Sequence, residues 1–115
     1  MKLLLALALL LVSLLASGAV TGCGPDTVSS QAHTLVEHGA RLVDVRSSVE
    51  FAAGHIDGAV NVPVQELKDR MDEIGPKTQP VVVYCRSGQR SASAKRTLEA
   101  NGYTAVFDLG PMSRW

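Results

Sequence analysis

Short apolar runs alternate with segments of helical pattern along most of the chain. The clearest run is residues 81–85, which holds three valines, a tyrosine and a cysteine and is typical of a strand buried in a parallel sheet. Shorter runs occupy residues 41–46, 60–62 and 103–109. Such alternation predicts an α/β domain of three layers, with a largely parallel sheet of about four or five strands and helices on both faces.

Helical patterns occupy the segments between these runs. Ser47 and Glu50 have the spacing of a capping box, which predicts the start of a short helix. Leu67, Met71 and Ile74 recur at intervals of four and three, which predicts an amphipathic helix. The expected helices are residues 31–38, 48–53, 64–73 and 91–101.

Cys85 stands at the carboxyl end of the clearest strand, the edge where open α/β sheets bind ligands. Arg86 and Arg90 follow closely, and the free amides of the next helix would point at the sulfur, so the sequence favours a thiolate. The same amides can hold an anion. The alternative is that Cys85 is only a small buried apolar residue. The flanking arginines and the glycine-containing turn argue against it.

Three charged residues form a second group of candidates. The strand over residues 41–46 should deliver Asp44 and Arg46 to the same sheet edge as Cys85. Arg46 could pair with Glu50, four residues on, or hold an anionic substrate, and the ion pair is the simpler role. Asp44 is placed to orient Arg90 or another donor of the cysteine loop.

The first residues have the pattern of an export signal. Lys2 is followed by an apolar stretch over residues 3–15, too short to span a membrane comfortably. Val-Thr-Gly-Cys at residues 20–23 resembles the lipobox of bacterial lipoproteins, in which cleavage leaves a lipidated cysteine, here Cys23. Ordinary cleavage near residues 16–18 is the alternative. Either reading predicts an exported protein of the periplasm or cell envelope.

Composition limits the remaining function classes. Eleven basic and eleven acidic residues balance, and no basic run or aromatic series suggests nucleic-acid binding. The three histidines and two cysteines show no metal-ligand spacing, so we expect no metal. The expected organisation is a signal peptide over residues 1–22, a tether over 23–27 and one domain over 28–115.

Two separated motifs resemble those of the rhodanese family. Residues 85–91 read Cys-Arg-Ser-Gly-Gln-Arg-Ser and are similar to the active-site loop of single-domain rhodaneses, which carry sulfane sulfur as a persulfide on the cysteine. Residues 44–63, with Asp-Val-Arg, Glu-Phe and Gly-His-Ile-Asp-Gly-Ala, resemble the upstream signature. Related phosphatase loops place five residues between cysteine and arginine. This loop has four, which favours sulfur over phosphate.

The resemblance implies a thiosulfate sulfurtransferase with Cys85 as nucleophile. Its partners would be a small sulfur donor and a thiophilic acceptor, cyanide or a thiol, with no cofactor and a membrane contact only through Cys23. Two alternatives stay open: a persulfide carrier with little turnover of free thiosulfate, and an enzyme like a phosphatase or arsenate reductase. The implied substrate-binding residues are Arg86, Ser87, Gly88, Gln89, Arg90 and Ser91, supported by Asp44, Arg46 and Glu50.

The last residues resemble the closing segment of the family, with one departure. Pro111 stands where the family has the second glycine of a pair, so an amide donor is missing there. Trp115 could form a wall of the pocket or an apolar lid on the core, and we favour the lid.

Overall fold

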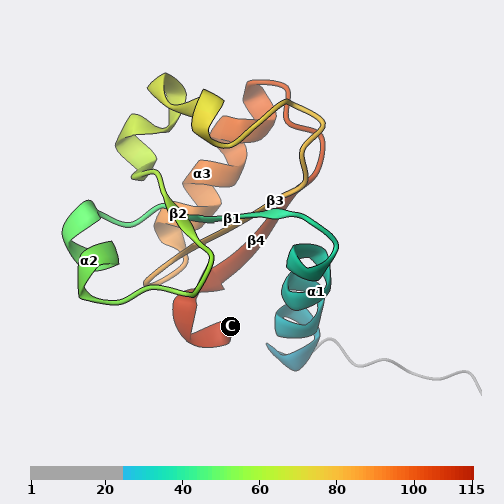
Figure 1. Ribbon diagram of the computed structural model, residues 1–115, viewed down its shortest axis with the longest axis vertical. Coiled ribbons are helices and arrows are strands. Elements are labelled where there is room, and N and C mark those ends of the chain that lie inside the picture. Colours follow the sequence, from blue (N-terminus) through green and yellow to red (C-terminus); the bar gives the residue numbers. More distant parts are fainter. Residues whose placement is uncertain (1–24) are drawn as a thin grey trace, which may run out of the picture.

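Four parallel strands form the middle layer of the structure, a computed structural model in which residues 25–115 are described (Figure 1). The strands are β1 (Arg41–Asp44), β2 (Val60–Asn61), β3 (Val81–Cys85) and β4 (Val106–Pro111). They lie in the order β2-β1-β3-β4, and every neighbouring pair is parallel. The predicted α/β architecture is confirmed, with four strands rather than five in the described part of the chain.

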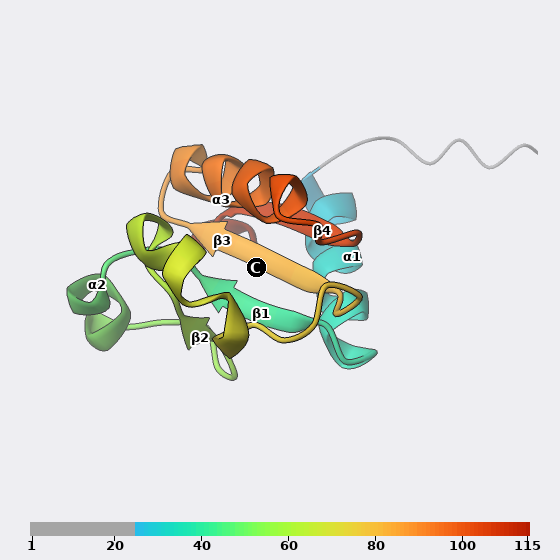
Figure 2. The same ribbon diagram turned by 90° about the horizontal axis from the view of Figure 1, so that it is seen from above.

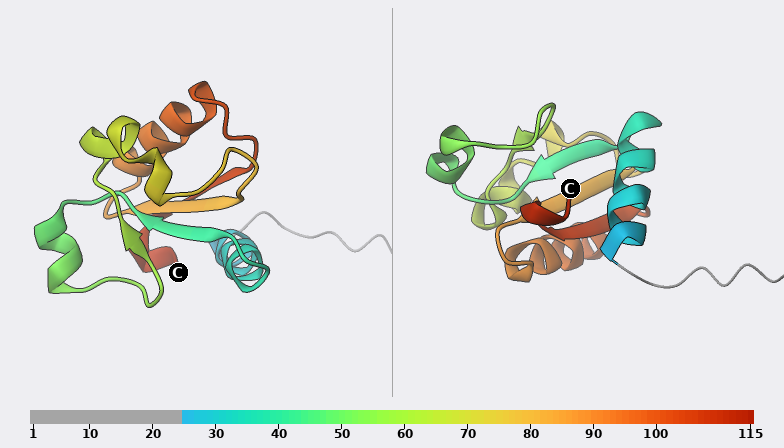
Figure 3. Two further views of the ribbon diagram at one scale, coloured as in Figure 1. Left: turned by 45° about the horizontal axis from the view of Figure 1, so that its top comes forward. Right: turned by 90° about the horizontal axis from the view of Figure 1, so that it is seen from below.

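Helices cover both faces of this sheet. The α-helices are α1 (Pro25–Glu37), α2 (Ser48–Ala53) and α3 (Gln89–Ala100), and the 3-10 helices are η1 (Val64–Asp69), η2 (Met71–Glu73) and η3 (Met112–Arg114). Figure 3 shows α3, η1 and η2 on one face and α1 and η3 on the other. The short helix α2 lies beyond the carboxyl ends of the strands (Figure 2).

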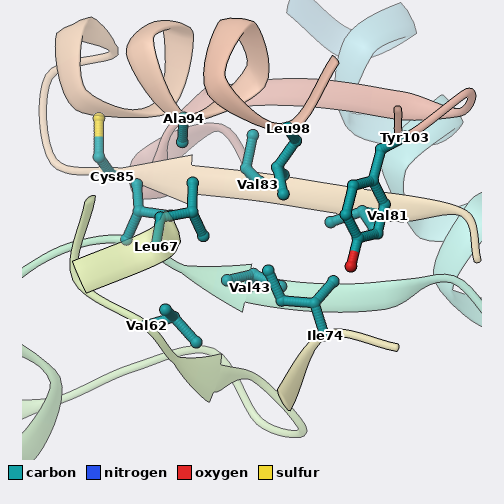
Figure 4. Packing of buried hydrophobic residues seen from close by; sticks show 11 residues of the cluster. Val43, Val62, Leu67, Ile74, Val81, Val83, Cys85, Ala94, Leu98 and Tyr103 are labelled. Atoms are coloured by element: carbon teal, nitrogen blue, oxygen red, sulfur yellow. The ribbon is translucent and has the colours of Figure 1, made fainter. Parts of the chain in front are cut away.

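The central strand β3 joins two hydrophobic clusters. All five of its residues are buried, and successive side chains point to opposite faces. Val83 and Cys85 point toward α3 and belong to one cluster, in which Leu98 lies beside Val83 (Figure 4), whereas Tyr84 packs on the α1 side. Cys85 is therefore fixed by a strand that both clusters hold in place.

The N-terminal helix begins earlier than expected. We predicted a tether over residues 23–27, but α1 starts at Pro25. Proline has the φ angle of the first helical position and needs no hydrogen bond there, which explains the early start. The predictions for residues 1–22 and for Cys23 lie outside the described residues. Within residues 25–115, none of the helices has both the length and the apolar character needed to cross a bilayer.

The predicted amphipathic helix over residues 64–73 is wrong. Two 3-10 helices, η1 and η2, stand there, separated at Arg70 by a backbone with φ −127° and ψ 24°. Leu67 and Ile74 are buried as the spacing predicted. The spacing of three fits a 3-10 turn as well as an α-helix, and the spacing of four from Leu67 to Met71 crosses the break at Arg70, so the pattern could not reveal the two short helices.

The last strand begins three residues later than predicted. Tyr103 is buried before the strand and donates its hydroxyl proton to the carbonyl oxygen of Gly75, 2.6 Å away. This anchors the loop before β3 to the start of β4. At the other end, Trp115 stacks on His33 of α1 with ring centroids 3.7 Å apart, which confirms that it covers the core.

Candidate active site

The sulfur of Cys85 lies at the end of β3, where the loop over residues 86–88 turns into α3. The side chain is fully buried, and Figure 4 shows it beside the first turn of α3. Gly88 donates its backbone N–H to Sγ over 2.9 Å. Gly88 has a φ of +100°, a left-handed conformation that glycine adopts without strain. The glycine of the loop thus turns an amide onto the sulfur.

A second hydrogen-bond partner of the sulfur comes from the first turn of α3. The hydroxyl oxygen of Ser91 lies 3.4 Å from Cys85 Sγ and 3.1 Å from the carbonyl oxygen of Gly88. A hydroxyl group can rotate about its C–O bond. Ser91 can therefore accept the proton of a thiol or donate its own proton to a thiolate, and it stabilises the charged form.

These contacts decide the ionisation of the sulfur. Burial raises the pKa of the Cys85 thiol, since a charge is poorly solvated in the protein interior. Hydrogen bonds from the Ser91 hydroxyl and from the amides of Ser91, Gly88 and Ser87 lower it, and together they outweigh burial. The pKa of Cys85 is therefore lowered, which favours the thiolate form of this buried side chain.

Substitution of Ser91 by alanine should raise the pKa of Cys85. The thiolate would lose its hydroxyl donor, so the pH profile of alkylation should move to higher pH. In the wild type, the pKa of Cys85 lies below that of an ordinary thiol. Its alkylation rate should therefore fall only at pH values more acidic than those at which an ordinary thiol loses reactivity. Iodoacetamide labelling across a pH series measures both profiles. Ser93→Ala, in the same helix but without a contact to the sulfur, is the control, and equal profiles for the two variants would contradict the assignment.

Arg90 is held by a carboxylate from α2. Its two terminal nitrogens donate to both carboxylate oxygens of Glu50, over 2.7 and 3.0 Å. Glu50 also accepts from the amide and hydroxyl of Ser47 and so closes the capping box predicted for α2. Arg90, together with these contacts from Ser47, holds the pKa of Glu50 well below its usual value. Arg90 thus fastens the loop to α2, and its charge is already matched.

The expected pairs of Asp44 and Arg46 are wrong. We favoured an ion pair of Arg46 with Glu50 over a contact with an anionic substrate, and we expected Asp44 to orient Arg90 or another donor of the cysteine loop. The two residues instead pair with each other, with Arg46 Nη2 2.7 Å from Asp44 Oδ2. Arg46 Nη2 also donates to the carbonyl oxygen of Gly54 over 2.7 Å. The Asp44 carboxylate is buried and only two residues from Arg46 in sequence. It therefore pairs with the guanidinium of Arg46 in place of Glu50. The pair supports the edge of the site without contacting the sulfur.

Arg86 is an arginine of the site that has no ion-pair partner among the described residues. It directly follows Cys85 and is exposed, and among residues 25–115 no carboxylate forms an ion pair with it. Ser87 and Gln89 are exposed beside it. The loop therefore presents one unpaired positive charge and polar side chains around a buried sulfur. No group of three or more metal-binding side chains occurs within the described residues.

A pocket next to the loop was not predicted. Its volume is about 340 Å3, and it is lined by Arg46, Glu50, Ala53, Gly54, Arg86 and Met112. Its residues come from the end of β1, from α2, from the cysteine loop and from η3. Sequence reasoning assigned no function to Ala53 or Met112, because small and apolar residues carry no chemical signal. Only their position relative to Arg86 makes them part of a pocket.

Sequence and structure comparisons agree on one family. Residues 28–115 match the model of the rhodanese-like domain. The chain is 39% identical over 69 residues to thiosulfate sulfurtransferase PspE of Escherichia coli, a match that spans 59% of this chain and 66% of PspE. It is 44% identical over 75 residues to a sulfurtransferase of Allochromatium vinosum, spanning 64% and 69%. The match to PspE thus covers slightly less than two thirds of that protein.

A solved structure shows the same fold. The human single-domain sulfurtransferase TSTD1 superposes with a TM-score of 0.66 at 31% identity, over 75% of this chain and 89% of that chain. The parallel sheet, the cysteine loop at its carboxyl edge and these matches lead to one conclusion: the chain belongs to the rhodanese-like domain family and has sulfurtransferases among its homologues.

Proposed function

We propose that the protein transfers sulfane sulfur from thiosulfate or a similar donor through a persulfide on Cys85. The Cys85 thiolate attacks the outer sulfur of thiosulfate, a new S–S bond forms, and sulfite leaves with the electron pair of the broken bond. A thiophilic acceptor, cyanide or a thiolate, then takes the outer sulfur and returns Cys85 to its thiolate form. Two half-reactions on one nucleophile predict ping-pong kinetics.

The observation that carries the proposal is the set of donors around one sulfur atom. The amide of Gly88 and the hydroxyl of Ser91 contact Sγ, and the pKa of Cys85 is lowered in spite of burial. Preorganised donors of this kind stabilise negative charge that develops during a reaction. The amides of residues 87–91 would hold the oxygens of the donor, and Arg86 would supply the unpaired positive charge.

The intact mass of the protein before and after incubation with thiosulfate tests the proposal. We expect a gain of one sulfur atom, with one sulfite released for each protein molecule, and cyanide should remove the added sulfur as thiocyanate. A protein that takes up sulfur but forms no thiocyanate in continuous turnover would be a persulfide carrier. A folded protein that gains no sulfur from thiosulfate or another sulfane donor would contradict the proposal.

We also propose that the protein is exported and anchored in the cell envelope through a lipid on Cys23. The apolar stretch over residues 3–15 and the lipobox-like Val-Thr-Gly-Cys ending at Cys23 support this. Protein extracted from membranes should begin at Cys23 and carry an acyl mass, and Cys23→Ala should lose both. Recovery of wild type without added mass, or cleaved near residues 16–18, would contradict lipidation.

A further inference from the structure

We propose that Asp108, in the last strand of the sheet, is a positioning residue of the sulfur site. Its side chain fixes a β-bulge near the carboxyl end of β4, and the bulge sets the ring of Pro111 against Gly88, whose amide donates to the sulfur. This role deepens the proposed function, because Gly88 stabilises the thiolate that the proposed reaction needs.

The pairing of β4 with β3 skips Leu109, which is an extra residue of β4. Before it, the two strands pair residue by residue up to Val83 and Asp108, and after it Cys85 lies opposite Pro111. A one-residue shift of register turns the side chains that follow to the opposite face of a sheet. Bulges are frequent next to active sites, where they re-aim a side chain. Here the bulge decides which residue of β4 lies beside the residue that holds the sulfur.

Two side chains satisfy backbone groups of the bulge. Oδ1 of Asp108 accepts the N–H of Gly110 over 2.8 Å, and Nη1 of Arg114 donates to the carbonyl oxygen of Leu109 over 3.2 Å. Gly110 has a φ of +81°, a left-handed conformation that glycine adopts without strain. The bond from Asp108 spans the extra residue, so without it the amide of Gly110 would lose the partner that fixes this turn.

The end of β4 packs against the cysteine loop at Gly88. A Cβ atom placed on Gly88 would lie 3.7 Å from Cδ of Pro111 and 4.0 Å from Cα of Gly110. Little more than the room of one methyl group therefore separates the loop from the strand. Proline has no N–H, and its Cδ takes the place of the amide hydrogen. Pro111 thus meets Gly88 with a rigid apolar ring.

The position of Gly88 matters because its amide contacts the reacting atom. The N–H of Gly88 donates to Cys85 Sγ over 2.9 Å and is one of the groups that lower the pKa of the thiol. A hydrogen bond weakens steeply when its direction is lost. The ring of Pro111 limits movement of Gly88 toward β4, and Asp108 fixes the ring. Asp108 therefore acts on the sulfur through two neighbours and without touching it.

A pair of substitutions at Asp108 isolates its hydrogen bond. Both Asp108→Ala and Asp108→Asn remove the charge, but only asparagine keeps an oxygen that can accept the N–H of Gly110. Alkylation by iodoacetamide should be followed across a pH series on the peptide that contains Cys85. We expect the midpoint to lie about half a unit to one unit higher in Asp108→Ala than in Asp108→Asn, because a weakened hydrogen bond to the thiolate raises the pKa of the thiol. Equal midpoints would overturn the role of Asp108.

Tyr103→Phe controls for a loss of stability. Tyr103 precedes β4 and donates to the carbonyl oxygen of Gly75. Figure 4 shows Tyr103 and Cys85 at opposite ends of β3. We expect this variant to be less stable in urea and to keep the wild-type midpoint of alkylation. A rise as large as that in Asp108→Ala would show that lost stability alone moves the midpoint, and it would overturn the assignment.

A double-mutant cycle tests whether Pro111 transmits the effect. Pro111→Gly removes the ring that meets Gly88. In this background the midpoints of Asp108→Ala and Asp108→Asn should differ by less than about half as much as in the parent, since residues that act through one contact are not additive. An undiminished difference would overturn transmission through the proline ring.

The alkylation midpoint depends on the thiol alone, so it separates this inference from the proposed function. A difference between the two Asp108 variants, in a protein that takes up no sulfur from thiosulfate, would support the positioning role and contradict the sulfurtransferase proposal. Sulfur uptake together with equal midpoints would overturn the positioning role alone.

Discussion

Replacing Cys85 with serine should abolish sulfur transfer from thiosulfate to cyanide. A serine hydroxyl cannot form a persulfide, and its proton is far harder to remove than that of a thiol, so the hydrogen bonds that ionise the thiol cannot ionise it. Loss of the nucleophile from a unit of this kind lowers turnover by about a thousandfold or more. Colorimetric measurement of thiocyanate formation follows the reaction.

A loss of activity in the Cys85→Ser protein can be assigned to the missing thiol only if the variant is folded. Serine is close to cysteine in shape, and the hydroxyl can donate to Ser91 or accept from Gly88, so the buried oxygen would have partners. We expect the variant to unfold cooperatively in urea, with the free energy of unfolding depending on urea concentration as in the wild type. A folded variant that retains more than about a tenth of the wild-type rate would remove Cys85 from the mechanism.

Faster turnover of an aryl phosphate than of thiosulfate by wild type would favour the phosphatase-like alternative.

Substitution of Gly88 by alanine should lower sulfur transfer by about a hundredfold to a thousandfold, the usual effect of losing one preorganised donor to a developing anion. Gly88 adopts a φ of +100°, which costs an L-residue about 1–2 kcal/mol. The backbone can relieve this strain by rotating, and rotation moves the amide away from Cys85 Sγ. The pKa of Cys85 should rise, and less of the sulfur will be ionised at neutral pH.

A glycine elsewhere in the chain provides the control for backbone strain. Gly39, after the end of α1, also has a φ of +100°, and a Cβ added there would meet nothing within 4 Å. Gly39→Ala should therefore lose a similar amount of stability in urea titrations without a comparable loss of sulfur transfer. If both variants lose activity equally, the effect of Gly88→Ala would come from stability alone, and the amide would have no special role.

Features determined by neighbouring residues could be predicted from the sequence. The capping box of Ser47 and Glu50 depends on a four-residue stretch, and the structure forms it where the spacing placed it. The apolar run over residues 81–85 could only be buried on both faces, and it became the central strand. The position of Cys85 at the sheet edge followed from that strand. The turn and the helix after it brought Gly88 and Ser91 to the sulfur.

Features that depend on the path of the chain could not be predicted. Glu50 and Arg90 are 40 residues apart in sequence, so no local pattern could reveal that they pair. Asp44 and Arg46 were expected at the edge of the sheet where they lie, but they pair with each other instead of with the expected partners. Arg70, at the break between η1 and η2, donates to the carbonyl oxygen of Asn61 in β2, a contact that no pattern within residues 64–73 reveals.

The double use of Glu50 has a consequence for local unfolding. One carboxylate both caps α2 and holds Arg90, and α2 has no buried side chain to stabilise it independently. Fraying of α2 would therefore release the arginine at the far end of the cysteine loop, while β3 and both hydrophobic clusters remained folded. We therefore expect opening of this short surface helix to free one end of the cysteine loop without global unfolding of the domain.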